Sequence, residues 1–342
     1  MGSEQQYIEL YQEARQMIIS HAPEHMNAIR DKAFEHFKAQ GFPTRRVERY
    51  KYTDLNLNRL NIPVDPYEAF RCDVPNLSTS LYFMVNDAFY TQETPKGHLP
   101  EGVFVGSMKE HPELVASHYG RLAKTDEDAV TALNTMLAQD GLLVYVPRHT
   151  KVERAIQVIN ILRSDVDLMV NRRVMIILED GAELKMLFCD HAADDRNFLS
   201  TQIIEAFVGN NASLDLYCLE ETHHKNVRIS NVYIEQQANS RVNHNVITLH
   251  NGVTRNRLDL TFAGEGAECG CYGCVIADKK QHVDNNTLIR HEVPHCTSTE
   301  LYKYVLNEDA VGAFAGRVYV AHGAQKTSSQ MTNQNLTASK TA

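Results

Sequence analysis

A turn followed by an alternating strand recurs along the second half of this 342-residue chain at a nearly constant interval. Five times, small or turn-forming residues precede a run in which every second residue is apolar. The first apolar residues of these runs are Leu184, Leu214, Val242, Cys269 and Leu301, which lie 30, 28, 27 and 32 residues apart. A second alternating run lies between successive anchors. Each unit therefore holds two strands and two turns.

A repeat of this length with a period-2 apolar pattern is typical of a solenoid, in which one coil buries its apolar face only against its neighbours. Five coils stacked at about 4.8 Å predict a core about 24 Å long. A sandwich of hairpins would show a similar alternation and is the alternative architecture. Strand-like runs at 142–146, 156–162 and 174–178 indicate that the core begins before the first anchor.

The first 140 residues have a different pattern. Apolar residues follow helical spacing over residues 4–18 and 26–37, and Gly41 and Pro43 end the second run. A further helix is predicted at 125–139, with Thr125 and Asp128 as a capping box. The chain is therefore divided into an N-terminal helical cap and linker region, 1–140, and a β-helix core, 141–342.

Two linking segments lie inside the first region. A mixed-charge aromatic segment covers residues 41–53, and a Pro-punctuated segment runs from Pro63 to Pro75. The aromatic segment is interpreted as a linker with aromatic anchors, and the alternative is a segment that docks a partner.

Composition limits the functions that remain. The chain has 34 basic and 43 acidic residues, a net charge of −9, and this balance argues against a nucleic-acid surface. The start resembles no signal peptide, and no apolar run is long enough to span a bilayer. Seven cysteines, an odd number at low density, indicate reduced thiols. We expect a soluble cytoplasmic protein.

The motif from His291 to His295, His-Glu-Val-Pro-His, matches the zinc-protease pattern in which two histidines on one helical face bind zinc beside a general-base glutamate. Pro294 argues against it, because proline inside a helix costs about 3 kcal/mol or more. A zinc-dependent hydrolase that uses His291, Glu292 and His295 is therefore only a secondary alternative.

Three cysteines form a C-x-C-x-x-C motif at Cys269, Cys271 and Cys274, and Cys296 follows. Thiolates at such spacing can hold zinc or an iron-sulfur cluster. Strand alternation places Cys269 and Cys271 on one face and Cys274 on the other. Two stacked core thiols are the favoured interpretation, and a metal or cluster carrier is the alternative.

His282 and Asp284 lie two residues apart, so a strand would place them on one face. A carboxylate beside a histidine can orient it for proton transfer or metal binding. The favoured interpretation is a hydrogen-bonded polar rung at a coil corner. Glycine-rich phosphate-binding motifs are missing, so any ATP would be bound by another subunit.

Several segments together resemble one known family. They are 41–44 (GFPT) with 47–53 (VERYKYT), 140–147 (DGLLVYVP), 278–284 (DKKQHVD) with Thr287 and His291, 312–320, and 324–327 with 330–336. Jointly, and in this order, they are similar to the SufB/SufD family of iron-sulfur cluster assembly scaffold subunits. The 47–53 segment and the short N-terminus resemble the SufD type, and the SufB type is the nearest alternative.

This resemblance implies a right-handed parallel β-helix (β-solenoid) with an N-terminal α-helical cap. It also implies a scaffold subunit without catalysis of its own, paired with a SufB-like paralogue and a SufC-like ATPase in a complex that assembles and transfers clusters. The cluster would be transient and ATP would be bound by SufC, so no stably bound cofactor is expected. No catalytic or metal-binding residue is assigned, flavin binding is left open, and the isolated chain could form a homodimer.

Members of the family continue into a helical C-terminal region that contacts SufC and contains a Cys-x-His-Gly-Ala segment. This sequence ends at Ala342, and the expectation is that the region is absent. The role of its histidine is not transferred to His282 or His322. Without that region the strand residues Val318 and Val320 would be uncovered, and a longer chain is expected to be more soluble.

Overall fold

The computed structural model describes residues 3–55, 57–63, 79–90 and 99–342. Four α-helices lie within these residues: α1 (Ser3–His21), α2 (Glu24–Gln40), α3 (Pro112–His118) and α4 (Ala129–Leu137). The strands are β1 (Ser80–Val85), β2 (Ala88–Tyr90), β3 (Phe104–Ser107), β4 (Leu142–Val146), β5 (Ile156–Leu162), β6 (Leu168–Leu178), β7 (Glu183–Ala192), β8 (Phe198–Val208), β9 (Ser213–Glu221), β10 (Asn226–Gln236), β11 (Arg241–His250), β12 (Val253–Phe262), β13 (Glu268–Ala277), β14 (His282–His291), β15 (Thr297–Leu306), β16 (Val311–Val320) and β17 (Ser328–Thr337).

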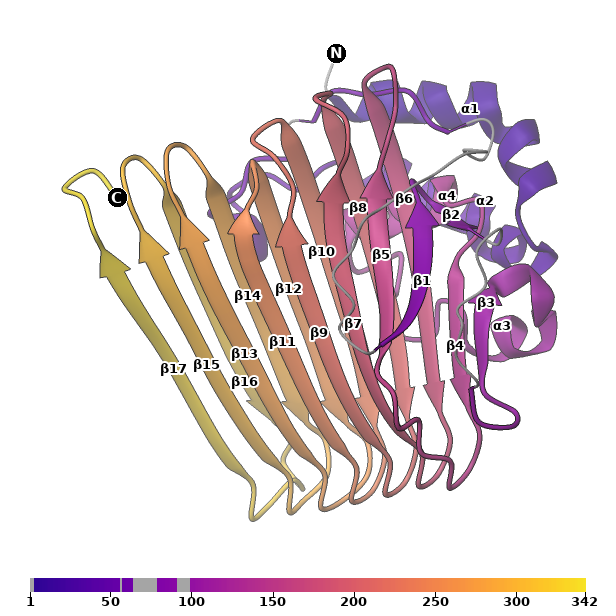
Figure 1. Cartoon of the computed structure of the whole chain (residues 1–342), viewed down its shortest axis with the longest axis vertical. Helices are drawn as coiled ribbons and strands as arrows, with labels where there is room; N and C mark the ends of the chain where they lie inside the picture. Colours follow the sequence, from indigo (N-terminus) through magenta and orange to yellow (C-terminus); the bar gives the residue numbers. More distant parts are fainter. Residues whose placement is uncertain (1–2, 56, 64–78, 91–98) are drawn as a thin grey trace.

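The strands form two facing sheets, and each coil contributes one strand to each sheet (Figure 1). Sheet A has the order β16-β14-β12-β10-β8-β6-β4-β3, and sheet B has the order β17-β15-β13-β11-β9-β7-β5-β1-β2. Neighbouring strands from successive coils are parallel, as in the pairs β8–β10 and β9–β11. The chain is therefore a parallel β-solenoid with N-terminal helices. The predicted fold class is confirmed, and the hairpin sandwich is excluded.

Within the described residues the solenoid has seven coils, from β4 with β5 to β16 with β17. The five predicted coils lie among them, and the core begins before Leu184, as the strand-like runs at 142–146, 156–162 and 174–178 indicated. Strands β5 and β6 are buried on both faces and show no alternation of apolar and polar residues. The last anchor was misplaced. Leu301 pairs with the outward-facing Tyr272, and its neighbour Glu300 is the buried residue.

Four of the predicted turns need a left-handed backbone conformation. Gly181, Asn211, Asn239 and Gly266 have φ between 54° and 71°, a region that glycine and asparagine adopt most readily. The amides of Gly181, Asn211 and Asn239 donate across the coil corner to the next coil, as Asn211 does to the carbonyl of Ala238 at 2.8 Å. These turns keep successive coils in register.

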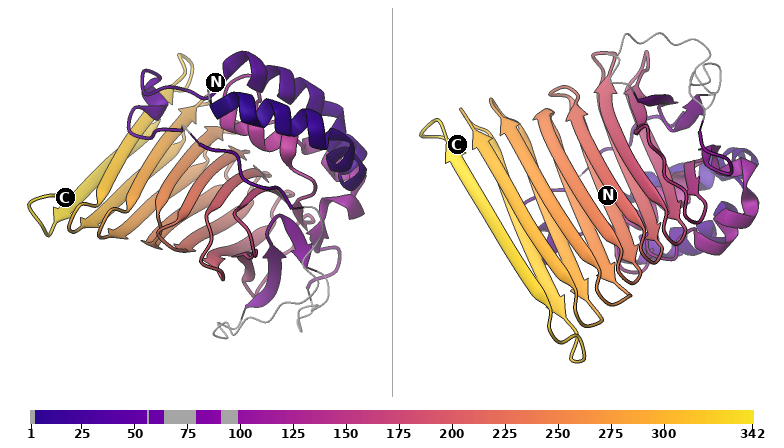
Figure 2. Two further views of the ribbon diagram at one scale, coloured as in Figure 1. Left: turned by 90° about the horizontal axis from the view of Figure 1, so that it is seen from above. Right: turned by 60° about the horizontal axis from the view of Figure 1, so that its bottom comes forward.

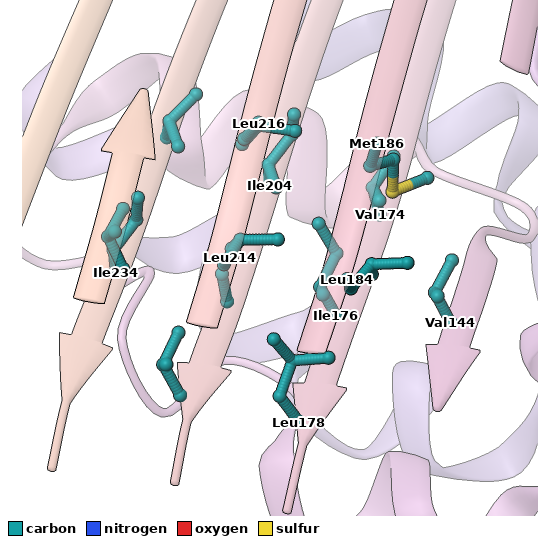
Figure 3. Close-up of a cluster of buried hydrophobic side chains, with 14 of the residues drawn as sticks. Val144, Val174, Ile176, Leu178, Leu184, Met186, Ile204, Leu214, Leu216 and Ile234 are labelled. Carbon is teal, nitrogen blue, oxygen red and sulfur yellow. The ribbon is translucent and has the colours of Figure 1, made fainter. Parts of the chain in front are cut away.

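The main core lies between the two sheets. Figure 3 shows aliphatic side chains from opposing strands meeting there, such as Ile176 and Ile204 of sheet A and Leu184 and Leu214 of sheet B. All four are at most 2 % exposed. At about 1.5–3 kcal/mol for each buried aliphatic side chain, this shared interior supplies most of the driving force for stacking.

The N-terminal helices cover the early coils on the side of sheet A, and the late coils extend beyond them (Figure 2). Tyr7 and Phe37 of α1 and α2 pack with Leu133 of α4 against Met169 and Leu199 of sheet A. The two N-terminal helical runs were predicted correctly. Within the described part of the chain, no helix is both long and apolar enough to cross a membrane.

The helix predicted at 125–139 is α4, and it begins later than predicted. It starts at Ala129, and Asp128 is its N-cap, because the Asp128 carboxylate accepts from the Thr131 amide at 2.9 Å. Thr125 takes no part in capping it.

The region before residue 140 also contributes strands, since β1 pairs in parallel with β5 and β3 pairs with β4. The division at residue 140 stays a prediction. Most of the Pro63–Pro75 segment lies outside the described residues.

Candidate functional site

The last coil is the part of the solenoid most open to a partner. Among the described residues, β16 pairs only with β14 and β17 pairs only with β15, so each sheet ends there with one strand edge unpaired. Apolar side chains are exposed on these strands: Val311 is 49 %, Val320 48 % and Leu336 61 % exposed. An edge of this kind is a template for pairing with another chain.

The backbone of β17 shows which groups are available at this edge. The amides of Ser328 and Ala338 donate back toward β15, to the carbonyls of Cys296 and Leu306. Because amide directions alternate along a strand, the amides of Met331, Asn333 and Asn335 point toward the open side. We call β16 and β17 the open edge.

The 47–53 segment docks on its own solenoid. Tyr50 is 3 % exposed, and its hydroxyl donates to Asp128 at the start of α4. Asp128 also pairs with Arg257 of β12 at 2.9 Å, and Arg257 pairs with Asp259 at 2.7 Å. Although burial alone would raise the pKa of Asp128, Arg257 and the Tyr50 hydroxyl hold that pKa below its usual value. The aromatic anchor is thus part of a buried ionic clamp.

A second contact continues the clamp one coil further. The Thr53 hydroxyl donates to the Asp284 carboxylate at 2.6 Å, and Arg255 lies 3.7 Å from the same carboxylate. Arg255 also donates to the carbonyl of Arg49. The segment therefore fastens the N-terminal cap to β12 and β14. Val47 and Tyr52 remain exposed on its other side.

The zinc-protease motif has no helix. His291 ends β14, the following residues form a bend, and His295 has a positive φ of 63°. The His291 side chain is buried, with Nε2 3.0 Å from the Ser298 hydroxyl, whereas Glu292 and His295 are exposed. No helix forms around Pro294, as predicted, and His291, Glu292 and His295 do not form the helical zinc site.

The cysteines follow the predicted alternation. Cys269 and Cys271 are 5 % and 0 % exposed in the solenoid interior, and Cys274 is exposed on the outer face of sheet B. Their separation rules out a joint C-x-C-x-x-C site. No group of three His, Cys, Asp or Glu side chains converges to hold a metal ion in the part of the chain that the structure describes.

His282 and Asp284 share the face of β14 that is turned toward the N-terminal segment. Asp284 is occupied by Thr53 and Arg255, and burial lowers the pKa of His282, which opposes its protonation. His291 lies on the opposite face. Of the two residues only Asp284 forms the predicted polar contact, and it binds the 47–53 segment rather than a coil corner, whereas Nε2 of His282 is buried without a partner.

Sequence reasoning missed a row of polar side chains inside the solenoid. They lie at inward positions of successive coils and form one hydrogen-bonded chain, with donor–acceptor distances of 2.9, 2.9, 2.8, 3.0 and 2.6 Å in the order Arg172, Asp190, Arg228, Asn256, Asn285 and Tyr304. Polar residues at inward positions of an alternating strand were the available signal. The row joins four of the coils through polar contacts in the middle of an apolar core.

Within the described residues, the stack of parallel coils with helices covering its early coils is a capped parallel β-solenoid. Two family models match this sequence: "SufBD protein N-terminal region" over residues 1–158, and "SUF system FeS cluster assembly, SufBD core domain" over residues 160–342. The chain belongs to the SufBD family of the SUF iron-sulfur cluster assembly system.

Known proteins of the same family are similar to this chain at low sequence identity. The iron-sulfur cluster assembly SufBD family protein slr0076 of Synechocystis is 24 % identical over 88 % of this chain and 70 % of its own length. The iron-sulfur cluster assembly protein SufD of Bacillus subtilis is 21 % identical over 100 % of this chain and 81 % of its own. The SufB protein of the same organism is 22 % identical over 64 % of this chain and 47 % of its own.

Proposed function

We propose that this chain is a SufD-type scaffold subunit that joins a SufB-like paralogue and a SufC-like ATPase, without catalysis of its own. One observation carries the SufD assignment: the match to SufD of Bacillus subtilis covers the whole chain, whereas the match to SufB of that organism covers 64 % of it. A SufB-type subunit is the alternative, because the two proteins match this chain at similar identity, 21 % for SufD and 22 % for SufB.

The open edge supports the proposal of a paired subunit. Its outward amides can continue a sheet into another chain, and its exposed apolar side chains would be covered by the same contact. In such a complex the iron-sulfur cluster is the cargo, and ATP is bound by the SufC-like subunit. In isolation, two copies of this chain could use the same edge to form a homodimer.

The direct test is co-purification of this chain with the SufB-like and SufC-like proteins of the same organism, weighed by native mass spectrometry. A complex that holds this chain and both partners supports the proposal. A chain that binds neither partner, or that replaces the SufB-like protein in a complex with a separate SufD-like subunit, contradicts it.

Charge placed on the open edge should weaken this pairing. We expect Val320→Lys with Leu336→Lys to reduce the affinity for the SufB-like partner at least tenfold, about 1.4 kcal/mol, because an interface would bury the new ammonium groups unpaired. The dissociation constant is measured by isothermal titration calorimetry with the SufB-like partner.

The matched control is Tyr217→Lys with Ile276→Lys, two exposed apolar positions on the outer face of sheet B. This control should bind as the unaltered chain does. Equal affinity for both double variants would place the interface elsewhere.

A further inference from the structure

Three inward side chains on neighbouring strands of sheet B form a ladder that the proposed function does not use. His244 of β11 is in register with Cys271 of β13, and Cys271 is in register with Glu300 of β15. The three residues are 2 %, 0 % and 1 % exposed. Adjacent strands lie about 4.8 Å apart, so each side chain is the direct neighbour of the next.

His244 lacks hydrogen bonds, since both of its ring nitrogens are buried without a partner. Leaving such a group unsatisfied costs about 1–3 kcal/mol, and buried orphan groups in native proteins call for a bound water, an ion or a chemical role. The Glu300 carboxylate is buried as well, with the Thr287 hydroxyl beside it. The thiol of Cys271 therefore lies between an unpartnered imidazole and a buried carboxylate.

A second thiol completes the set. Cys269 lies two residues before Cys271 on the same face of β13, and the neighbouring Cys269 thiol, together with burial, raises the pKa of Cys271. The donors that point into this part of the solenoid therefore include two sulfur atoms, one imidazole and one carboxylate. Thiolates with imidazole suit Zn²⁺ and similar thiophilic divalent cations, and residues on adjacent strands can bring such ligands together.

We propose that Cys269 and Cys271, flanked by His244 and Glu300, form a binding site for a thiophilic divalent cation inside the solenoid. The three kinds of donor do not converge on one point in the described, metal-free chain. Closure therefore requires His244 and Glu300 to rotate toward the thiol pair, and the two thiol protons are released as the metal binds. Because the site is buried, the metal enters as the coils form.

Cobalt is a suitable probe, because Co²⁺ bound by thiolates gives a charge-transfer absorption that free Co²⁺ lacks. The full-length chain is refolded without oxygen in the presence of Co²⁺. We expect one equivalent to bind with this absorption, and we expect Cys269→Ser and Cys271→Ser each to abolish it. His244→Asn and Glu300→Gln should each weaken binding tenfold or more. Far-UV circular dichroism checks that each variant has folded.

Cys274→Ser is the matched control, because it removes the exposed thiol of the same strand and should leave the absorption unchanged. A band that survives Cys269→Ser and Cys271→Ser would overturn the proposal. An independent measurement uses the unaltered chain alone: refolding with Zn²⁺ should raise its thermal midpoint. A chain that binds no Co²⁺ and gains no stability from Zn²⁺ overturns the proposal whatever the variants do. Neither result bears on partner capture at the open edge.

Discussion

Replacing Arg257 with methionine is expected to destabilise the fold by about 3–5 kcal/mol, because Asp128 would be left as a buried charge without its cation. The guanidinium is 1 % exposed and donates to Asp128 and, through two bonds, to Asp259. Methionine keeps much of the volume of arginine and removes the charge. The loss is measured as the free energy of unfolding in urea, followed by far-UV circular dichroism.

Arg15→Met provides the matched control. Arg15 also forms a two-bond ion pair, with Asp31, but the two side chains are 45 % and 63 % exposed. An exposed pair of this kind contributes less than about 1 kcal/mol. If Arg15→Met and Arg257→Met lower the free energy of unfolding by similar amounts, burial does not strengthen the ion pair between Arg257 and Asp128.

Replacing Glu300 with glutamine is expected to stabilise the metal-free protein at alkaline pH. Burial raises the pKa of Glu300 to about 7, from a usual value of 4.5. Because the folded state holds the proton more tightly than the unfolded state, the stability that the protonated form provides is fully present below pH 4.5 and is lost as the pH rises through 7. A shift of this size corresponds to about 3 kcal/mol.

The measurement is the difference between the unfolding free energies of Glu300→Gln and the unaltered chain, in buffer with a chelator, from pH 4.5 to pH 8. The difference should be near zero at pH 4.5 and about 3 kcal/mol in favour of the variant at pH 8. Taking this difference removes the opposite contribution of His244, whose pKa burial lowers to about 4. Glu183→Gln, at an exposed position of β7, should show no such trend. A flat difference for Glu300→Gln would mean that its carboxylate is solvated.

Much of the solenoid could be predicted because alternation reports directly which side chains share a face. It placed Leu184, Leu214 and Val242 inside, and it separated Cys271 from Cys274. Alternation fails where both faces of a strand are buried, as in β5 and β6, so these strands were predicted only as apolar runs at 156–162 and 174–178 and supplied no repeat anchor. It also fails where a buried position is polar. For that reason Leu301 was chosen over its buried neighbour Glu300.

The ionic clamp could not be predicted from the pattern, because its members are far apart in the sequence. Tyr50 and Asp128 are separated by 78 residues, and Thr53 and Asp284 by 231. No local propensity links such positions. The segment 41–53 is interpreted from its composition as a linker with aromatic anchors, and the structure shows which surface Tyr50 is anchored on, that of the same chain.

The contact between Thr53 and Asp284 also fixes an order of events during synthesis. A ribosome that adds about 5–20 residues each second makes Asp284 roughly 10–50 s after Thr53. During that interval α1 and α2 can form and Tyr50 can meet Asp128, yet the Thr53 hydroxyl has no carboxylate to bind. Final docking of the first residues made must therefore await some of the last, and a nascent chain carries its N-terminal cap only partly fastened through most of its translation.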